Sequence, residues 1–224
     1  MNHIVQNINK LRAHIPSHVK IVAVSKTKTI PEIREAVEAG QVIFGESKVQ
    51  ELTGKYEQIP DVQWHLIGHL QTNKVKYIVP FVQMIQTVDS FRILEEIDRQ
   101  AGEINRVIDC LLQIHIAREE TKFGLSGHEA IELLENPALQ GFRHIRLCGL
   151  MGIATFTEDM ETVREEFRGL FRFFQHIREK YFSADASFCE LSMGMSDDYH
   201  IAVEEGATMV RIGSLIFGKR MYVQ

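Results

Sequence analysis

The fold is decided by residues 19–40, VKIVAVSKTKTIPEIREAVEAG, where a short apolar run precedes an amphipathic helix. Residues 19–25 are rich in β-branched side chains and give way to the polar KTKT, which indicates a buried strand. Pro31 stands where helices favour proline in their first turn, and Gly40 is a residue type that commonly ends a helix. This stretch therefore predicts one strand followed by one helix.

The same strand–helix unit recurs roughly every 25 residues, which is typical of a parallel sheet. We expect strands at residues 19–25, 42–45, 64–69, 84–88, 107–116, 145–155, 186–194 and 208–218. Eight units in 224 residues favour an α/β fold with a closed (β/α)8 TIM-type barrel over an open, doubly wound sheet. An extra N-terminal helix over residues 2–14 is expected to lie outside the barrel. Because no linker divides the sequence, we expect one domain covering residues 1–224.

Composition and charge exclude several classes of protein. The sequence is 45% hydrophobic and 25% charged, which argues against disorder and fibres. No apolar run approaches the ~18 residues of a membrane span. The net charge of −5 gives no general electrostatic reason for nucleic-acid binding. Three cysteines without a C-x-x-C pair, and a start that lacks a signal peptide, favour reduced thiols in a cytoplasmic protein.

The end of the first predicted strand carries a candidate nucleophile. Functional groups of such barrels gather at the carboxyl ends of the strands, and Lys26 directly continues the apolar run there. Partial burial and the nearby Lys28 favour a neutral amine, which can form a Schiff base with an aldehyde. The alternative is an ordinary solvated lysine at a strand end.

Small residues follow the last two predicted strands, where barrels of this kind commonly bind phosphate. Gly194 and Gly213 would allow close approach of the backbone, and the serines could add hydroxyl donors. These serines are Ser192, Ser196 and Ser214. The alternative is ordinary turn chemistry, in which glycine and serine simply end strands. Together with a Schiff-base lysine, a phosphate site here is the arrangement that pyridoxal 5'-phosphate requires.

Other candidate sites are weaker. His65 and His69 are four residues apart but flank a strand end, so we expect no metal site. Residues 68–74 lack the spacing of a nucleotide P-loop. Glu51 and Lys122 could reach the mouth of the barrel, although solvated positions are the simpler interpretation.

Seven strings, in this order, match a known family: AVSKTKT, FGESKVQE, WHLIGHLQTNK, ETKFG, LMGIAT, LSMGMSDDY and GATMVRIGSLIFG. They extend from about residue 19 to residue 218, and together they resemble the YggS/PROSC family of pyridoxal phosphate homeostasis proteins. The resemblance implies a barrel similar to the N-terminal domain of alanine racemase. It also implies that Lys26 holds pyridoxal 5'-phosphate as an aldimine.

The resemblance further implies roles for the other cofactor-binding candidates. Ser192 and the Gly213–Ser214 pair match phosphate-binding positions, and Arg211 matches the arginine that faces the pyridine nitrogen. His69 and Met193 match residues close to the cofactor.

One motif departs from the family pattern, which usually reads F-G-E-N-Y-V-Q-E. Here Ser47 and Lys48 replace the asparagine and the tyrosine. Ser47 is shorter and lacks the amide donor, so we expect a water to take its place, while Lys48 adds positive charge near the mouth. Cofactor binding is expected to survive because the lysine, the arginine and the phosphate site remain.

The sequence favours a cofactor carrier over a catalyst. Racemisation usually needs two positioned acid/base groups, and Lys26 supplies one. In alanine racemase, as the resemblance implies, the other comes from a second, β-rich domain, which we do not expect in this sequence. Arg211 at the ring nitrogen would also weaken the electron sink that catalysis uses.

We therefore expect a non-catalytic, monomeric protein that acts in vitamin B6 homeostasis and delivers pyridoxal phosphate to apo-enzymes, with no catalytic residues. The alternatives are a slow, pyridoxal-phosphate-dependent amino-acid racemase and an unrelated barrel such as an aldolase.

Overall fold

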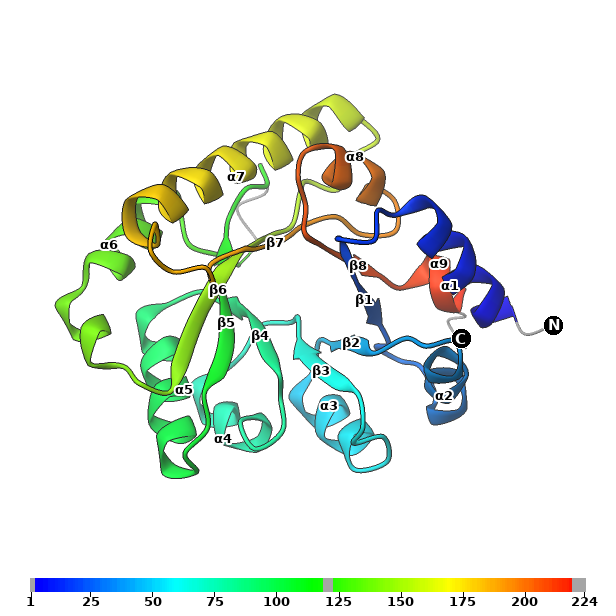
Figure 1. Cartoon of the computed structure of the whole chain (residues 1–224), viewed down its shortest axis with the longest axis horizontal. Coiled ribbons are helices and arrows are strands. Elements are labelled where there is room, and N and C mark those ends of the chain that lie inside the picture. Colours follow the sequence, from blue (N-terminus) through cyan, green and yellow to red (C-terminus); the bar gives the residue numbers. More distant parts are fainter. Residues whose placement is uncertain (1–2, 119–122, 219–224) are drawn as a thin grey trace.

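Eight parallel strands close into a barrel in sequence order, with β8 returning to lie beside β1 (Figure 1). The computed structural model describes residues 3–118 and 123–218. The strands are β1 (Lys20–Val24), β2 (Ile43–Glu46), β3 (Gln63–Leu66), β4 (Met84–Val88), β5 (Ile108–Ile114), β6 (Ile145–Gly152), β7 (Glu190–Ser192) and β8 (Met209–Ile212). The barrel predicted from the strand–helix alternation is confirmed.

Helices follow the strands and surround the barrel. They are α2 (Ile30–Glu38), α3 (Val49–Tyr56), α4 (Val75–Ile78), α5 (Phe91–Glu103), α6 (Gly127–Glu135), α7 (Met160–Tyr181), α8 (Tyr199–Glu204) and α9 (Ser214–Phe217), with short 3-10 turns η1 (Thr72–Lys74) and η2 (Pro137–Gly141). The extra helix α1 (His3–His14) lies outside the barrel and packs against α2 and α9 (Figure 1). The amide of Asn7 donates a hydrogen bond of 3.0 Å to the carbonyl of Ile216, which ties α1 to α9.

Local sequence explains where α2 begins and ends. Thr29 accepts a hydrogen bond from the backbone N–H of Glu32, while the Glu32 carboxylate accepts one from the N–H of Thr29. This capping box satisfies backbone donors that the first turn leaves unpaired. Pro31 lies in that turn, and Gly40, just past the helix, has a φ of +79°. Both residues act as the sequence predicts.

The barrel separates two apolar regions. Alternate residues of a strand face opposite sides of the sheet, so Val22 and Ala23, which are neighbours in β1, belong to different clusters. Val22 packs with Met84, Leu111 and Met209, which also come from strands and fill the interior of the barrel. The larger cluster lies between the outer face of the sheet and the helices. Burial on both faces explains why the strands read as nearly continuous apolar runs.

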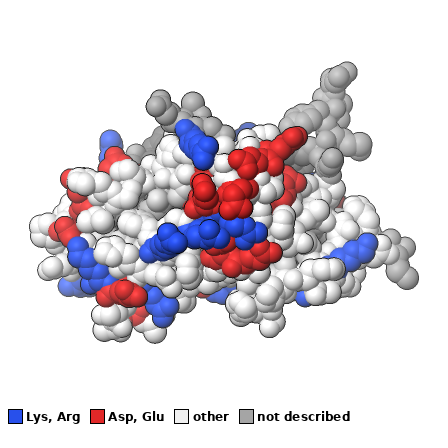
Figure 2. All heavy atoms as spheres, turned by 90° about the horizontal axis from the view of Figure 1, so that it is seen from above, with Lys and Arg blue, Asp and Glu red and all other residues white. Residues whose placement is uncertain are grey.

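Ion pairs join α7 to α8 on the surface above the barrel. Arg164 pairs with Glu204 and Glu205, and Arg168 also pairs with Glu205. Figure 2 shows this face, on which basic side chains lie among acidic ones. These pairs help to fix α8, and with it the loop that follows β7.

Three elements differ clearly from the prediction. The eighth strand, expected over residues 208–218, covers only Met209–Ile212, and residues 214–217 form the helix α9 instead. The seventh strand, expected over residues 186–194, covers only Glu190–Ser192, because the chain turns towards α8 at Gly194, which has a φ of +90°. The helix expected after the third strand is split into η1 and α4. Within the described ranges, no helix combines the length and the hydropathy that a membrane crossing requires.

Candidate functional site

The carboxyl ends of the strands surround a cavity of about 590 Å³, called the larger cavity here. Lys26 lies two residues beyond the end of β1, is partly buried, and lines this cavity. Arg211 of β8 and the Gly213–Ser214 pair that follows it also line the cavity, together with Ser47 from the end of β2. The structure thus brings five of the candidate positions together.

Helix α3 holds the backbone on both sides of Lys26. The carbonyl of Ser25 accepts a hydrogen bond of 2.7 Å from Nζ of Lys55, and the N–H of Thr27 donates one of 2.6 Å to the Glu51 carboxylate. Thr27 has a φ of +67°, in the left-handed region that a β-branched residue rarely adopts. The loop that carries the lysine is therefore fixed in a strained conformation.

Lys55 lies between two carboxylates behind this loop. Its Nζ is 2.7 Å from Oε1 of Glu46 and 2.6 Å from Oε1 of Glu51. Burial raises the pKa of Glu46, and the hydrogen bonds from Lys55 and Ser25 offset only part of that effect. Burial also acts on Glu51, but hydrogen bonds from Lys55 and from the N–H of Thr27 lower its pKa below the usual value. Oε2 of Glu46 is buried and accepts no hydrogen bond from the described residues.

Arg211 is anchored inside the barrel by hydrogen bonds. Its Nη1 donates to Oγ of Ser192 over 2.7 Å, and its Nη2 donates to the carbonyl of Gly152 over 2.9 Å. Burial lowers the pKa of Arg211 to about 10, so the guanidinium stays charged at neutral pH. The cation is therefore held in one orientation beside the larger cavity.

The support of Arg211 continues deeper into the barrel. Oγ of Ser192 donates to Oε1 of Gln86 over 2.7 Å, and the Gln86 amide donates to Nδ1 of His65 over 2.9 Å. Burial, with a smaller contribution from Lys20, lowers the pKa of His65 to about 3, so this histidine is neutral. Its other nitrogen, Nε2, carries the ring proton, because an amide N–H can only donate to Nδ1.

The turn after β8 forms an anion-binding arrangement with a hydroxyl from the turn after β7. Oγ of Ser196 accepts hydrogen bonds from the N–H groups of Gly213, at 3.3 Å, and Leu215, at 3.5 Å. Ser196 lines the larger cavity with Gly213 and Ser214. A hydroxyl that accepts two N–H bonds keeps its own proton free to donate to an anion in the cavity. The hydroxyls of Ser196 and Ser214, which both line the cavity, can thus donate to a phosphate.

Four candidate residues lie outside the lining of the larger cavity: three lie behind its wall, and His69 lies in a second cavity. Ser192 is fully buried and bonds to Arg211 and Gln86, as described above. Met193 is buried in the apolar cluster around the barrel. At Gly194, an added Cβ would lie 2.5 Å from Cβ of Ala202, so this glycine allows α8 to pack closely. The structure places these residues behind the cavity wall, where they support it.

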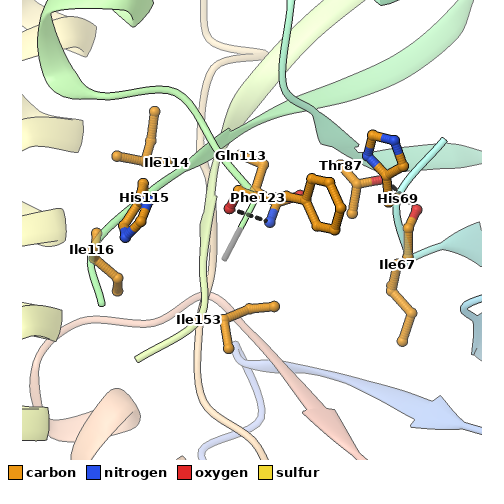
Figure 3. Close-up of a pocket in the computed structure, with 10 residues that line it drawn as sticks. Ile67, His69, Thr87, Gln113, Ile114, His115, Ile116, Phe123 and Ile153 are labelled. Carbon is orange, nitrogen blue, oxygen red and sulfur yellow. Dashed lines mark hydrogen bonds between the residues drawn. The ribbon is translucent and has the colours of Figure 1, made fainter. Parts of the chain in front are cut away.

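His69 lines a second, smaller cavity of about 220 Å³, called the smaller cavity here (Figure 3). Its Nδ1 is 2.9 Å from Oδ2 of Asp89, and its ring stacks on Phe123 with the centroids 4.2 Å apart. A carboxylate can only accept at neutral pH, so Nδ1 donates and Nε2 remains available. The two cavities share Ile67 and Ile153 as walls.

Two loops are in close contact where the two cavities adjoin. Ser47 lines the larger cavity and Gly68 lines the smaller one. A Cβ added to Gly68 would lie 2.2 Å from the carbonyl oxygen of Ser47, so only glycine fits at this position. The backbone of the second strand motif, where the sequence departs from the family pattern, is therefore packed directly against the third.

Sequence reasoning missed the residues that support the lysine loop. Glu51 was interpreted as solvated, whereas it binds the N–H of Thr27, and nothing in the sequence distinguished Lys55 from a surface lysine. Their i, i+4 spacing indicates an ion pair within the predicted helix, but it does not indicate that the pair lies against the lysine loop. Lys122 lies outside the described residues. Among those that are described, no cluster of histidine, cysteine and acidic side chains is suited to hold a metal ion.

Comparison with known proteins gives consistent results. Residues 1–221 match the family model "Alanine racemase, N-terminal domain". A pyridoxal phosphate homeostasis protein of Aquifex aeolicus is 40% identical over 91% of this chain and 88% of its own length. The human protein of the same name is 37% identical over 91% of this chain and 77% of its own length.

Solved structures have the same fold. PipY of Synechococcus elongatus, with PLP bound, has a TM-score of 0.87 and 35% identity, and the match covers 96% of this chain and all of PipY. An alanine racemase of Clostridium difficile has a TM-score of 0.78 at 15% identity over 99% of this chain and 58% of its own. This second likeness shows the fold alone.

Proposed function

This chain belongs to the pyridoxal phosphate homeostasis proteins, a family built on the N-terminal domain of alanine racemase, and from that membership we propose its function. It binds pyridoxal 5'-phosphate and takes part in vitamin B6 homeostasis. We further propose that residues 1–224 act as one cofactor-binding domain, that Lys26 forms the covalent link, and that the protein holds the cofactor without robust catalytic turnover.

The observation that carries the proposal is the presence of an amine and an anion site in one cavity. Pyridoxal phosphate has an aldehyde and a phosphate ester, and the larger cavity offers Lys26 for the first and the Ser196–Gly213–Ser214 turn for the second. Its volume of about 590 Å³ lies within the ~300–1,000 Å³ of typical ligand sites. The residues present therefore fit the cofactor.

The chemistry of the bound cofactor is that of an aldehyde, which forms a reversible Schiff base with a primary amine. The chain's own residues determine the rest. Glu51 and Lys55 fix the backbone around Lys26, so the amine is held at one place in the cavity wall. Ser196 and the Gly213–Ser214 pair bind the phosphate, and Arg211 faces the pyridine nitrogen, as the resemblance implies.

Arg211 is the main reason to propose a carrier. Its guanidinium is charged at neutral pH and is held by Ser192 and Gly152. A fixed cation beside the pyridine nitrogen disfavours protonation of that nitrogen, and the ring is then a weaker electron sink. This property suits reversible holding of the cofactor better than chemistry at an amino-acid α-carbon.

The proposal extends to partners and location. A carrier needs recipients, and apo-enzymes that use pyridoxal phosphate are the natural class. We propose that the protein acts as a monomer in the cytoplasm. The thiols of Cys110, Cys148 and Cys189 are free, which supports a reducing compartment.

The test is a visible spectrum of the purified protein before and after borohydride, followed by peptide mapping. A yellow protein whose label maps to Lys26 supports the assignment. A label that maps mainly to Lys28, which lines the same cavity, would overturn it.

A slow amino-acid racemase is the second candidate, and one observation favours it. His69, oriented by Asp89, gives the mouth of the barrel an acid/base group besides Lys26. The discriminating measurement is deuterium incorporation at the α-carbon of L-amino acids, with D-isomer formation followed in parallel. D-isomer production that is lost in Lys26→Ala and in His69→Gln would establish a racemase, and the absence of both signals supports a carrier.

A further inference from the structure

The smaller cavity has no role in the function proposed above, and its size limits what it can hold. At about 220 Å³ it is below the ~300–1,000 Å³ of sites that enclose a whole ligand. It is large enough for a side chain. The smaller cavity is therefore suited to one part of a molecule whose remainder lies elsewhere.

The lining of the smaller cavity is apolar in character. Ile67, Ile114, Ile116, Ile153 and Phe123 form its walls (Figure 3). None of the described residues that line it is a lysine, an arginine, an aspartate or a glutamate. A hydrocarbon group would gain free energy from burial here, whereas a charged group would lose hydration without finding a counter-ion.

The polar side chains of the lining are already hydrogen-bonded to the protein. The Thr87 hydroxyl donates to the carbonyl of Gly68 over 2.8 Å, and the Gln113 amide donates to the carbonyl of Phe123 over 2.9 Å, the bond drawn in Figure 3. Nε2 of His115 is 2.8 Å from the carbonyl of Ala117. With these bonds made within the protein, an apolar group can enter without leaving those donors unpaired.

The smaller cavity lies beside the larger one. Ile67 and Ile153 line both, and the backbones of Ser47 and Gly68 touch between them. The shared walls place the two cavities side by side, which is the arrangement that a molecule with one end in each would need.

The larger cavity is suited to the polar end of such a molecule. Lys26, Lys28 and Arg211 line it against one acidic residue, Asp197, so its lining favours anions. A phosphate and a carboxylate can both be accommodated there. The pair of cavities thus matches a ligand with an anionic head and a hydrocarbon tail.

We propose that the smaller cavity is a subsite for the side chain of an apolar α-amino acid whose amino group meets the cofactor in the larger cavity. The inference rests on the proposed function, because Lys26 and its cofactor define where the amino group must lie. It adds a preference among amino acids that the carrier function alone does not require.

The test uses stable adducts in which borohydride has joined pyridoxal phosphate to an amino acid. The full chain, freed of its cofactor, is titrated calorimetrically with phosphopyridoxyl-leucine and with phosphopyridoxyl-glycine. Burial of a hydrocarbon side chain predicts that the leucine adduct binds about tenfold more tightly or more. Equal affinities for the two adducts would overturn the inference. If neither adduct binds and pyridoxal phosphate also fails to bind, the proposed function fails instead.

Variants of residues that line the smaller cavity test whether the preference for the leucine adduct arises there. Phe123→Ala opens the smaller cavity and Ile116→Phe fills it, so each is expected to reduce the leucine preference to about threefold or less. Phe123→Tyr keeps the wall and is expected to retain the preference. Ile104→Ala is the matched control, because Ile104 is an exposed apolar residue that lines neither cavity. Unchanged binding of the glycine adduct verifies that each variant is folded, and an unchanged preference in folded Phe123→Ala and Ile116→Phe would overturn the inference.

Discussion

The backbone N–H of Thr27 donates a hydrogen bond of 2.6 Å to the carboxylate of Glu51, one residue beyond the lysine that we propose as the cofactor link. Thr27 has a φ of +67°, and the left-handed conformation costs a residue other than glycine roughly 1–2 kcal/mol. A carboxylate on α3 thus maintains a strained loop beside Lys26. The position of the amine depends on this contact.

Glu51→Ala is expected to lower the free energy of unfolding by about 1–2 kcal/mol, because it removes a charge-assisted hydrogen bond to a strained backbone. Urea unfolding measures the change, and Gln50→Ala, at an exposed neighbour, is the control. Adding Thr27→Gly is expected to recover part of the loss, since glycine adopts positive φ without strain. A stability equal to that of the wild type in Glu51→Ala would show that the contact does not hold the loop.

Lys26→Ala is expected to remove the visible absorption of the bound cofactor or to shift it to that of the free aldehyde. Spectra and borohydride labelling of the variant measure this directly. Lys28→Ala is the matched control, because Lys28 lines the same cavity and pairs with Glu32 in α2. Loss of the band in Lys28→Ala with retention in Lys26→Ala would reverse the assignment.

Ser196→Ala is expected to weaken binding of pyridoxal phosphate by roughly tenfold while leaving pyridoxal nearly unaffected, because a hydrogen bond to a charged acceptor contributes ~1.5–3 kcal/mol. Equilibrium titration of both compounds gives the ratio. Ser17→Ala, at an exposed serine in the opposite loop before β1, is the control. A similar loss of affinity for pyridoxal and for its phosphate would mean that Ser196 stabilises the structure of the site and does not bind the phosphate directly.

Lys55→Met is expected to make stability fall as the pH rises. Burial already raises the pKa of Glu46, and loss of the Lys55 cation raises it further. The unfolded chain then ionises this carboxyl before the folded protein does, so stability decreases from the ordinary glutamate range up to the folded pKa. The free energy of unfolding, measured at pH 5 and at pH 8, tests how steeply stability falls with pH. Adding Glu46→Gln should remove the slope, and persistence of the slope in the double variant would assign it to another group.

His65→Gln is expected to make the protein less sensitive to acid. The folded pKa of His65 is about 3, below its ordinary value of 6.5. Between these values the unfolded chain takes up a proton that the folded protein excludes, so stability is lost as the pH falls through this range. Thermal melts from pH 7 to pH 4 measure the effect, with His128→Gln, an exposed position, as the control. If the thermal stability of the wild type and of His65→Gln fell in parallel with decreasing pH, the argument that buried His65 excludes a proton would be contradicted.

The barrel was predictable from sequence because its strands are covered on both faces. Residues 147–152, LCGLMG, are buried throughout, so burial leaves a continuous apolar run in the sequence that is easily found. The helix after the first strand was equally clear, since Thr29, Pro31 and Gly40 each perform a local task that depends only on neighbours in the chain.

The detailed site was only partly predictable. Ser192 and Ser196 are both serines in one short motif, yet one lies under Arg211 and the other faces the larger cavity. The left-handed conformation of Gly194 between them decides which serine faces the cavity, and no pattern in the sequence reports it. Lys55, in α3, was missed for a related reason. Its burial depends on an ion pair with the carboxylate of Glu46, which lies in β2.

The pairing of β1 with β8 has a consequence for synthesis. Lys26 follows the first strand and Gly213 follows the last, so nearly the whole described chain must leave the ribosome before they can meet. Until then the lysine is an ordinary amine on an unfinished polypeptide. With the proposed role of Lys26, capture of the cofactor is confined to molecules that have completed folding, and the ligand in turn draws the population towards that finished state by mass action. The yellow colour of a preparation would then measure how much of it is correctly folded.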